Sequence, residues 1–130
     1  MNRIRLSDIP YQSLAITTGW SVEYNQFRDI KPNSGIKVIG LPEEDAWSLF
    51  TQDLLHLKHE SYNIRIDLGW SPEASPEGFY LLTVLKDKDW RNPLYYYESK
   101  NKGDIVEKIN YWLRRVTHDL VFTSLKAELN

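Results

Sequence analysis

The most constraining feature of the sequence is a pair of apolar segments joined by a loop with strong turn signals. Residues 62–70 read YNIRIDLGW, in which apolar and polar side chains alternate as in a strand with one buried face. Residues 79–85 are apolar almost without interruption, which is typical of a strand covered on both faces. The intervening loop contains Pro72, Pro76 and Gly78. Together these segments predict an antiparallel hairpin with a long tip.

The segment that follows Pro42 predicts a helix that ends at about Lys58. Proline tolerates the first helical position, and the acidic residues after it complement the free amides of a first turn. Apolar side chains then recur at three- and four-residue spacing, which makes a stripe that can pack on a sheet. The stripe consists of Trp47, Phe50, Leu54 and Leu57.

Patterns elsewhere complete an α+β fold, in which a mainly antiparallel β-sheet of about four strands has helices packed on one face. A second helix is expected at 102–116, with Asn101 or Ser99 as its cap. The strands are expected at 20–27, 62–70, 79–87 and 94–98, and a brief strand is also compatible with 36–39.

The length of the chain predicts a single domain. At 130 residues it is long enough to bury one core without disulfides, and we expect the domain to span 1–130. Its core is expected at 19–116, while the C-terminal tail, 117–130, continues a helical spacing of apolar residues. The first segment, 1–18, combines strand-like alternation with a helix-start signal, so its structure stays open.

Composition restricts the classes of function. The chain has no cysteine, which excludes a disulfide framework, a thiolate nucleophile and a cysteine-bound zinc, and makes the cytoplasm the expected location. It has no apolar run of signal-peptide or membrane-spanning length, so we expect neither secretion nor a membrane partner. The net charge is −2, without the basic surplus that phosphate binding requires. We therefore expect a protein partner or a small ligand rather than nucleic acid.

The sequence contains no recognised catalytic motif, neither a glycine-rich phosphate loop nor a nucleophile elbow. We therefore expect a protein that is not an enzyme and that uses no cofactor. The best metal candidate is Asp53, His56 and His59 in the expected helix, but the third side chain is rotated by about 60 degrees from the first. A solvated helix end, where histidine favours the helix dipole, is preferred over a metal site.

Acidic and tryptophan side chains gather in the expected loops. Aromatic anchors surrounded by polar groups are typical of protein interfaces. The alternative is that Trp70 and Trp90 close the ends of the core, while the acidic residues keep the surface soluble. The candidate contacts to a partner are Asp29, Trp70, Glu73, Glu77, Asp87 and Trp90.

Several short motifs follow one another between residues 19 and 115. They are Gly19-Trp20, Val22, Asn25, Phe27, Asp29-Ile30, Pro32, Trp47, Phe50, Gln52-Asp53-Leu54-Leu55, Ile66-Asp67-Leu68-Gly69-Trp70, Pro72, Pro76, Gly78, Tyr80, Asp89-Trp90 and Asn92-Pro93-Leu94. In this order they resemble small bacterial immunity proteins, the antidotes encoded beside polymorphic or contact-dependent growth inhibition (CDI) toxins.

The resemblance implies a cytoplasmic protein that binds the C-terminal domain of a cognate toxin and blocks its active site or substrate surface. A nuclease is the expected toxin activity. The resemblance implies no catalytic residue, and no contact residue carries over, because such families diversify at the contact surface. The alternative is a small ligand-binding protein or enzyme with a cleft beside the sheet, lined by Arg65, Asp67 and Tyr95 or Tyr97.

Overall fold

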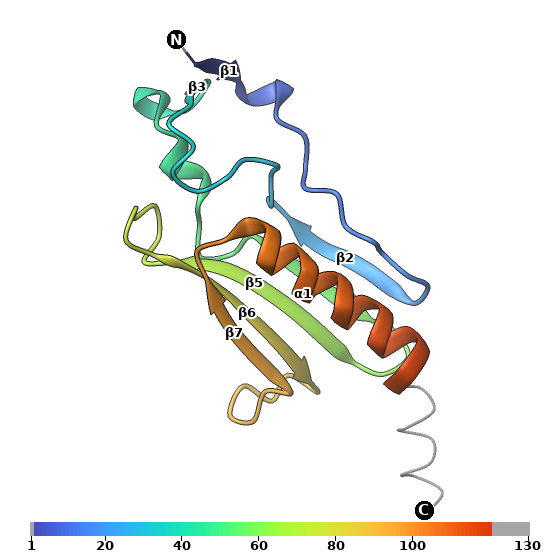
Figure 1. The fold of residues 1–130 in the computed structure, drawn as a ribbon. Helices are drawn as coiled ribbons and strands as arrows, with labels where there is room; N and C mark the ends of the chain where they lie inside the picture. The colour runs from blue at the N-terminus through green and yellow to red at the C-terminus, as the bar shows by residue number, and fades with distance from the viewer. Residues whose placement is uncertain (1, 121–130) are drawn as a thin grey trace, which may run out of the picture.

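The computed structural model describes residues 2–120 and has an α+β architecture, with one long helix packed against an antiparallel sheet (Figure 1). The strands are β1 (Arg3–Arg5), β2 (Trp20–Asn25), β3 (Lys37–Ile39), β4 (Leu55–His59), β5 (Ile64–Ser71), β6 (Phe79–Lys86) and β7 (Tyr95–Ser99). The helical elements are the 3₁₀ turns η1 (Leu6–Asp8), η2 (Pro42–Glu44) and η3 (Ala46–Leu49), the α-helix α1 (Lys102–Arg114) and the π-helical turn η4 (Arg115–Leu120). The predicted tail falls partly in η4, and its remainder, 121–130, lies outside the described residues.

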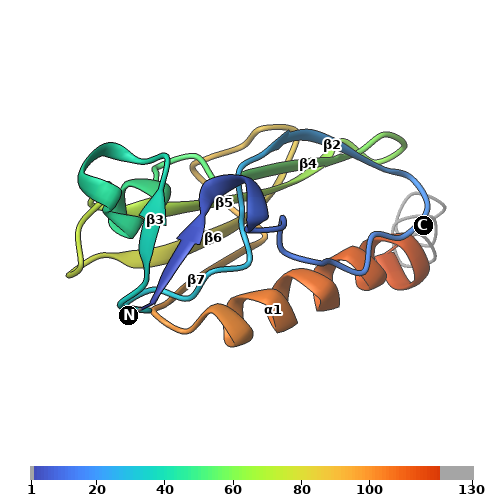
Figure 2. The same cartoon turned by 90° about the horizontal axis from the view of Figure 1, so that it is seen from above.

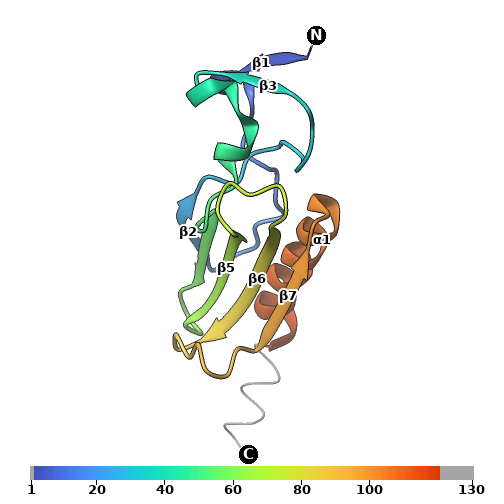
Figure 3. The ribbon, with the colours of Figure 1, turned by 90° about the vertical axis from the view of Figure 1, so that its left-hand side faces the viewer.

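The main sheet has five strands in the order β2-β4-β5-β6-β7, and each neighbouring pair is antiparallel. The α+β class and the antiparallel sheet are therefore confirmed, but the strand count of about four was one too low. A separate two-stranded sheet pairs β1 with β3 in parallel. This small sheet and the turns η2 and η3 lie beyond one end of the main sheet (Figure 3).

The predicted helix from Pro42 to Lys58 is wrong. The segment instead forms η2 and η3 and then the strand β4, which pairs with β2 on one side and β5 on the other. Glu43 and Glu44 adopt a positive φ of 54°, which interrupts a helix at its start. In β4 the buried side chains alternate with partly exposed ones, so the period is two rather than 3.6. Sheet pairing on both edges has overridden the helical spacing of the apolar residues.

The helix α1 covers one face of the sheet, as Figure 2 shows. Its first turn is capped by Asn101, whose side chain accepts a hydrogen bond from the Asp104 amide at 2.9 Å, as the sequence predicted. α1, continued by η4, is the only α-helix within residues 2–120, so one helix covers the sheet instead of the two that the sequence predicted. Its buried stripe consists of Ile105, Ile109 and Leu113, and Val116 in η4 continues it. None of the helices in residues 2–120 has both the length and the apolar character to cross a membrane.

The predicted hairpin is confirmed as β5 and β6, which pair along eight residues from Ile64 opposite Lys86 to Ser71 opposite Phe79. Near the tip, the chain just before β4 lies against β5. A Cβ added to Gly69 would lie 1.8 Å from the Gln52 carbonyl oxygen, so only glycine fits there. The Trp70 amide donates to the Thr51 carbonyl at 2.8 Å, which fastens this segment to the sheet.

At the other end of the sheet, His59 is buried among aromatic rings. It is only 4% exposed, and its ring centroid lies 5.2 Å from those of both Trp20 and Tyr62. A Cβ on Gly19 would lie 2.4 Å from His59 Nε2, so the absence of a side chain at Gly19 makes room for the imidazole. Burial lowers the pKa of His59, and the nearby Glu60 carboxylate opposes this effect only in part. The ring is therefore held in its neutral form.

A buried neutral histidine makes stability depend on pH. Below the ordinary pKa of 6.5 the unfolded chain binds a proton that the folded chain resists, so the His59 contribution is present above that pH and is lost as the pH falls toward the lowered pKa. Urea unfolding of the wild type should therefore show a free energy that drops between pH 7 and 5. In His59→Leu this drop should be smaller, because that position no longer titrates. Parallel pH curves for the two proteins would contradict the burial of His59.

Candidate functional site

The face of the sheet opposite α1, called here the outer face, is formed by alternate residues of the strands. Figure 2 shows α1 on one side of the sheet and the connection between β6 and β7 curving over the other. Strand register places these side chains on the outer face: His56 and Lys58 from β4, Arg65 and Asp67 from β5, Leu81, Thr83 and Leu85 from β6, and Tyr96 and Glu98 from β7. No α-helix in the described chain packs on this face.

Large apolar side chains stay exposed on and around the outer face. Trp90 is 60% exposed and Tyr96 49%, and Leu94 and Tyr24 are similarly open. Beneath Trp90 lies a groove of 190 Å³. It is lined by His56, Leu57, Arg65, Ile66, Asp67, Leu85, Lys88 and Trp90. Exposed aromatic rings beside a groove that combines apolar and charged side chains are typical anchors of a protein interface.

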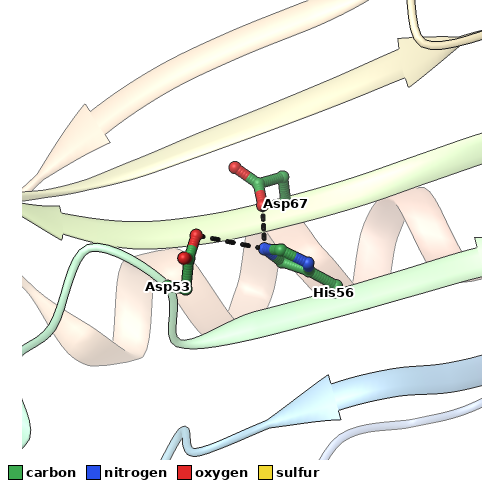
Figure 4. A group of neighbouring side chains, drawn as sticks. All are labelled: Asp53, His56 and Asp67. Carbon is green, nitrogen blue, oxygen red and sulfur yellow. Dashed lines mark ion pairs between the residues drawn. The ribbon is translucent and has the colours of Figure 1, made fainter.

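Three polar side chains meet on the outer face where β4 pairs with β5 (Figure 4). The Nε2 atom of His56 lies 2.6 Å from Asp67 Oδ1 and 3.3 Å from Asp53 Oδ1. The ligand-type atoms of Asp53, His56 and Asp67 all lie within 4.8 Å of one another. Burial raises the pKa of the Asp67 carboxyl, His56 opposes that rise, and Asp53 adds to it through charge repulsion. This group therefore concentrates negative charge around one imidazole nitrogen.

Neighbouring groups hold this part of the face in place. Arg65 donates from Nη1 to the Glu23 carboxylate at 2.8 Å, which turns the guanidinium toward the β2 edge. The Tyr24 ring lies 5.6 Å from the His56 ring, centroid to centroid. The imidazole is thus packed between an aromatic ring and two carboxylates, while the nearest arginine is engaged elsewhere.

The predicted contact residues do not form one patch. Glu73 and Glu77 lie in the hairpin tip, whereas Asp87 and Trp90 lie in the connection at the opposite end of β6. Strands of eight residues separate these two ends by roughly 25 Å. Glu73 accepts a hydrogen bond from the Gln52 amide at 3.2 Å, and Asp87 accepts one from Asn63 Nδ2 at 3.0 Å. Of the six predicted residues, Trp90 is the one that lines the outer-face groove.

Trp70 was predicted as a contact, and the structure corrects this. Its side chain is 1% exposed, its ring packs 5.1 Å from Phe50 and 5.0 Å from Tyr80, and its indole N–H donates to the Ser75 carbonyl at 2.9 Å. A buried ring whose polar atom is satisfied within the fold has no surface to offer a partner. Trp70 therefore closes the core, which was the alternative reading of the sequence.

Asp29 is engaged in a structural ion pair. Its carboxylate accepts a hydrogen bond from Nζ of Lys102, the first residue of α1, and Gln12 accepts a second one from the same ammonium. Lys102 is buried, whereas the Asp29 side chain is about half exposed. Because a buried ammonium requires partners, Asp29 and Gln12 tie the N-terminal segment to the start of α1.

The metal candidate considered from the sequence grouped His56 with His59, and the structure shows that this grouping is wrong. In the trio Asp53, His56 and His59, the last points into the core, because neighbouring odd and even residues of β4 face opposite sides of the sheet. Asp67 takes its place, since it lies directly opposite His56 in the β4–β5 register. The alternation of Leu55 and Leu57 with polar residues was the signal that could have revealed this pairing.

The residues predicted to line a small-molecule cleft do not come together in the structure. Arg65 and Asp67 lie on the outer face, whereas Tyr95 and Tyr97 point toward α1. The Tyr95 ring packs 5.3 Å from Trp112, and the Tyr97 hydroxyl donates to Asp104. The sheet itself separates the two halves of that predicted lining.

Comparisons with known proteins leave the site to be interpreted from its geometry: no protein-family model, no curated protein and no solved structure matches the chain.

The structural role of Asp29 gives a direct test. Asp29→Ala removes the only charged partner that the described residues offer to the buried Lys102 ammonium, so it should lower the free energy of unfolding by about 1–3 kcal/mol. Glu77→Ala, at an exposed carboxylate in the hairpin tip, is the matched control and should stay within about 0.5 kcal/mol of the wild type. Urea unfolding measures both. Equal stability of Asp29→Ala and Glu77→Ala would contradict the structural role.

Proposed function

We propose that the chain is an immunity-type protein that binds the C-terminal domain of a cognate bacterial toxin and neutralises it by contact. The observation that carries the proposal is the outer face, a sheet surface without a helical cover that bears exposed Trp90, Leu94 and Tyr96 beside a mainly apolar groove with charged residues in its wall. The order of sequence motifs that resembles immunity proteins supports the same function. In this proposal the protein acts by covering the toxin's active site or substrate surface and performs no chemistry of its own.

The chemistry of the outer face suits recognition of a protein. Exposed rings contribute large apolar area at a low cost in side-chain entropy, and the polar residues around them supply hydrogen bonds. The three exposed apolar side chains are close together in the chain, because Trp90 and Leu94 belong to the connection that leads into β7, where Tyr96 lies. This short segment is therefore the candidate anchor.

Charge on the outer face is mixed. Asp53, Asp67 and Glu98 lie among the basic Lys58 and Lys88, and the whole chain carries a net charge of only −2. Long-range attraction to a basic nuclease therefore contributes little, and close fit at the aromatic anchor dominates the proposed affinity. The acidic residues at the hairpin tip, Glu73 and Glu77, would contribute to affinity mainly through the association rate.

A second candidate function, binding of a small apolar ligand, is favoured by a different groove. It has a volume of 420 Å³, which falls in the range of ligand pockets, and it lies between β1 and the loop that follows Asp29. Its walls are mostly apolar: Ile4, Ile9, Pro10, Ile30, Pro32 and Ile36. The groove lies away from the outer face, so the two functions can be tested separately.

The anchor residues give the test of the leading proposal. Binding of the purified protein to the toxin domain encoded immediately upstream should weaken by about 2 kcal/mol, roughly thirtyfold, in both Trp90→Ala and Tyr96→Ala. Calorimetry or surface plasmon resonance measures the change, and rescue of growth on co-expression should weaken in parallel. The reason is that each variant removes a ring from the centre of the proposed interface.

A matched control lies on the other side of the molecule. Tyr111 is 41% exposed on α1, so Tyr111→Ala removes another exposed ring without touching the outer face and should leave affinity unchanged. If Tyr111→Ala lost affinity while both outer-face variants bound normally, the toxin would bind the α1 side, and the outer face would not be the interface. A toxin domain that is neither bound nor neutralised would overturn the proposed function itself.

A further inference from the structure

Three side chains from different parts of the chain converge on one point of the outer face, and their donor atoms are those of a metal site. Asp53 lies just before β4, His56 lies within β4, and Asp67 lies opposite His56 on β5. We propose that Asp53, His56 and Asp67 bind a divalent transition-metal cation, for which Zn²⁺ is the natural probe (Figure 4). This inference goes beyond the proposed function and depends on no partner.

The spacing of the donor atoms is close to that of a metal-ligand set. With metal–ligand bonds of about 2.0–2.1 Å, two ligands of a tetrahedral site lie roughly 3.3 Å apart. His56 Nε2 lies 3.3 Å from Asp53 Oδ1, which matches this separation, and 2.6 Å from Asp67 Oδ1, which is shorter. The third pair, the carboxylate oxygens of Asp53 and Asp67, lies within 4.8 Å. A cation therefore requires the Asp67 carboxylate to turn away from His56 Nε2, a change of side-chain torsion that moves no strand.

The bonding of His56 supplies a second observation. Its Nε2 atom is buried, and among the described residues it has no partner with hydrogen-bond geometry, although two carboxylates lie close to it. A nitrogen in this position faces concentrated negative charge without a properly directed N–H···O bond. A cation between the nitrogen and the two oxygens would satisfy all three groups at once.

The donor set also selects among cations. One imidazole nitrogen with two carboxylate oxygens and no sulfur suits Zn²⁺, Mn²⁺ or Ni²⁺, whereas Ca²⁺ and Mg²⁺ prefer oxygen ligands alone. Three protein ligands leave at least one coordination position for a further group. The groove of 190 Å³ beneath Trp90 shares His56 and Asp67 with the cluster, so a water molecule or a ligand has access from that side.

The competing explanation is a protonated His56 that forms ion pairs with both aspartates and binds no metal. Two properties separate it from the proposal. A metal site gives saturable binding with one cation per chain, and its affinity depends on all three side chains. An ion-pair cluster loses stability when one member is removed, but it gives no cation-dependent signal.

Isothermal titration calorimetry of the metal-free protein with Zn²⁺ tests the proposal. The wild type should bind one equivalent, and Asp53→Asn, His56→Gln and Asp67→Asn should each weaken binding by more than about tenfold, because even loss of a group that only supports a ligand costs about 10–100-fold. Mn²⁺ titrations should follow the same order of variants, while Ca²⁺ should give no comparable heat. Asp53 is 67% exposed, so Asp53→Asn is the variant least able to disturb the fold.

The chain contains three histidines, which provides a matched control. His118 is exposed on η4, away from the cluster, so His118→Gln should bind Zn²⁺ as the wild type does. Circular dichroism of every variant confirms that it is folded before titration. Absence of saturable Zn²⁺, Mn²⁺ and Ni²⁺ binding, or wild-type affinity in folded Asp53→Asn and His56→Gln, would overturn the proposal.

Discussion

The pairing of β4 between β2 and β5 is the constraint on which the rest of the structure depends. A strand with antiparallel neighbours on both edges must send successive side chains to opposite faces. Leu55, Leu57 and His59 therefore enter the core beneath α1, while His56 and Lys58 reach the outer face. A shift by one residue would bury two polar side chains and expose the leucines, so the hydrophobic effect fixes the register strongly.

That register links the core to the site. The same strand that buries the neutral His59 against Trp20 holds His56 opposite Asp67. Two histidines three residues apart consequently have different environments: one is enclosed by aromatic rings, and the other is surrounded by carboxylates. Because the sheet backbone positions His56 and Asp67, their relative placement depends little on loops, and the groove beneath Trp90 opens beside a rigid floor.

Local sequence patterns predicted the elements that depend on local interactions. The β5–β6 hairpin followed from alternation and turn residues, and α1 followed from the Asn101 cap and the stripe through Ile105 and Ile109. β4 was not predicted, because the spacing of the apolar residues from Trp47 to Leu57 fits a helical period as well as it fits the turn η3 followed by a strand. The site depends on this strand. Because β4 was not predicted, the proximity of His56 and Asp67, which are eleven residues apart, could not be predicted either. The acidic residues of the loops likewise gave no information about the burial of Trp70, because that burial depends on tertiary contacts.

All of these features require residues 55–59 to form an inner strand rather than the end of a helix. Nuclear Overhauser effects in the isotope-labelled protein test it most directly, because backbone protons report pairing without reference to any ligand. We expect interstrand contacts between the backbone protons of His56 and Asp67 and between those of Leu57 and Ile66. A continuous series of sequential amide–amide contacts through 46–58, without contacts across the sheet, would contradict it.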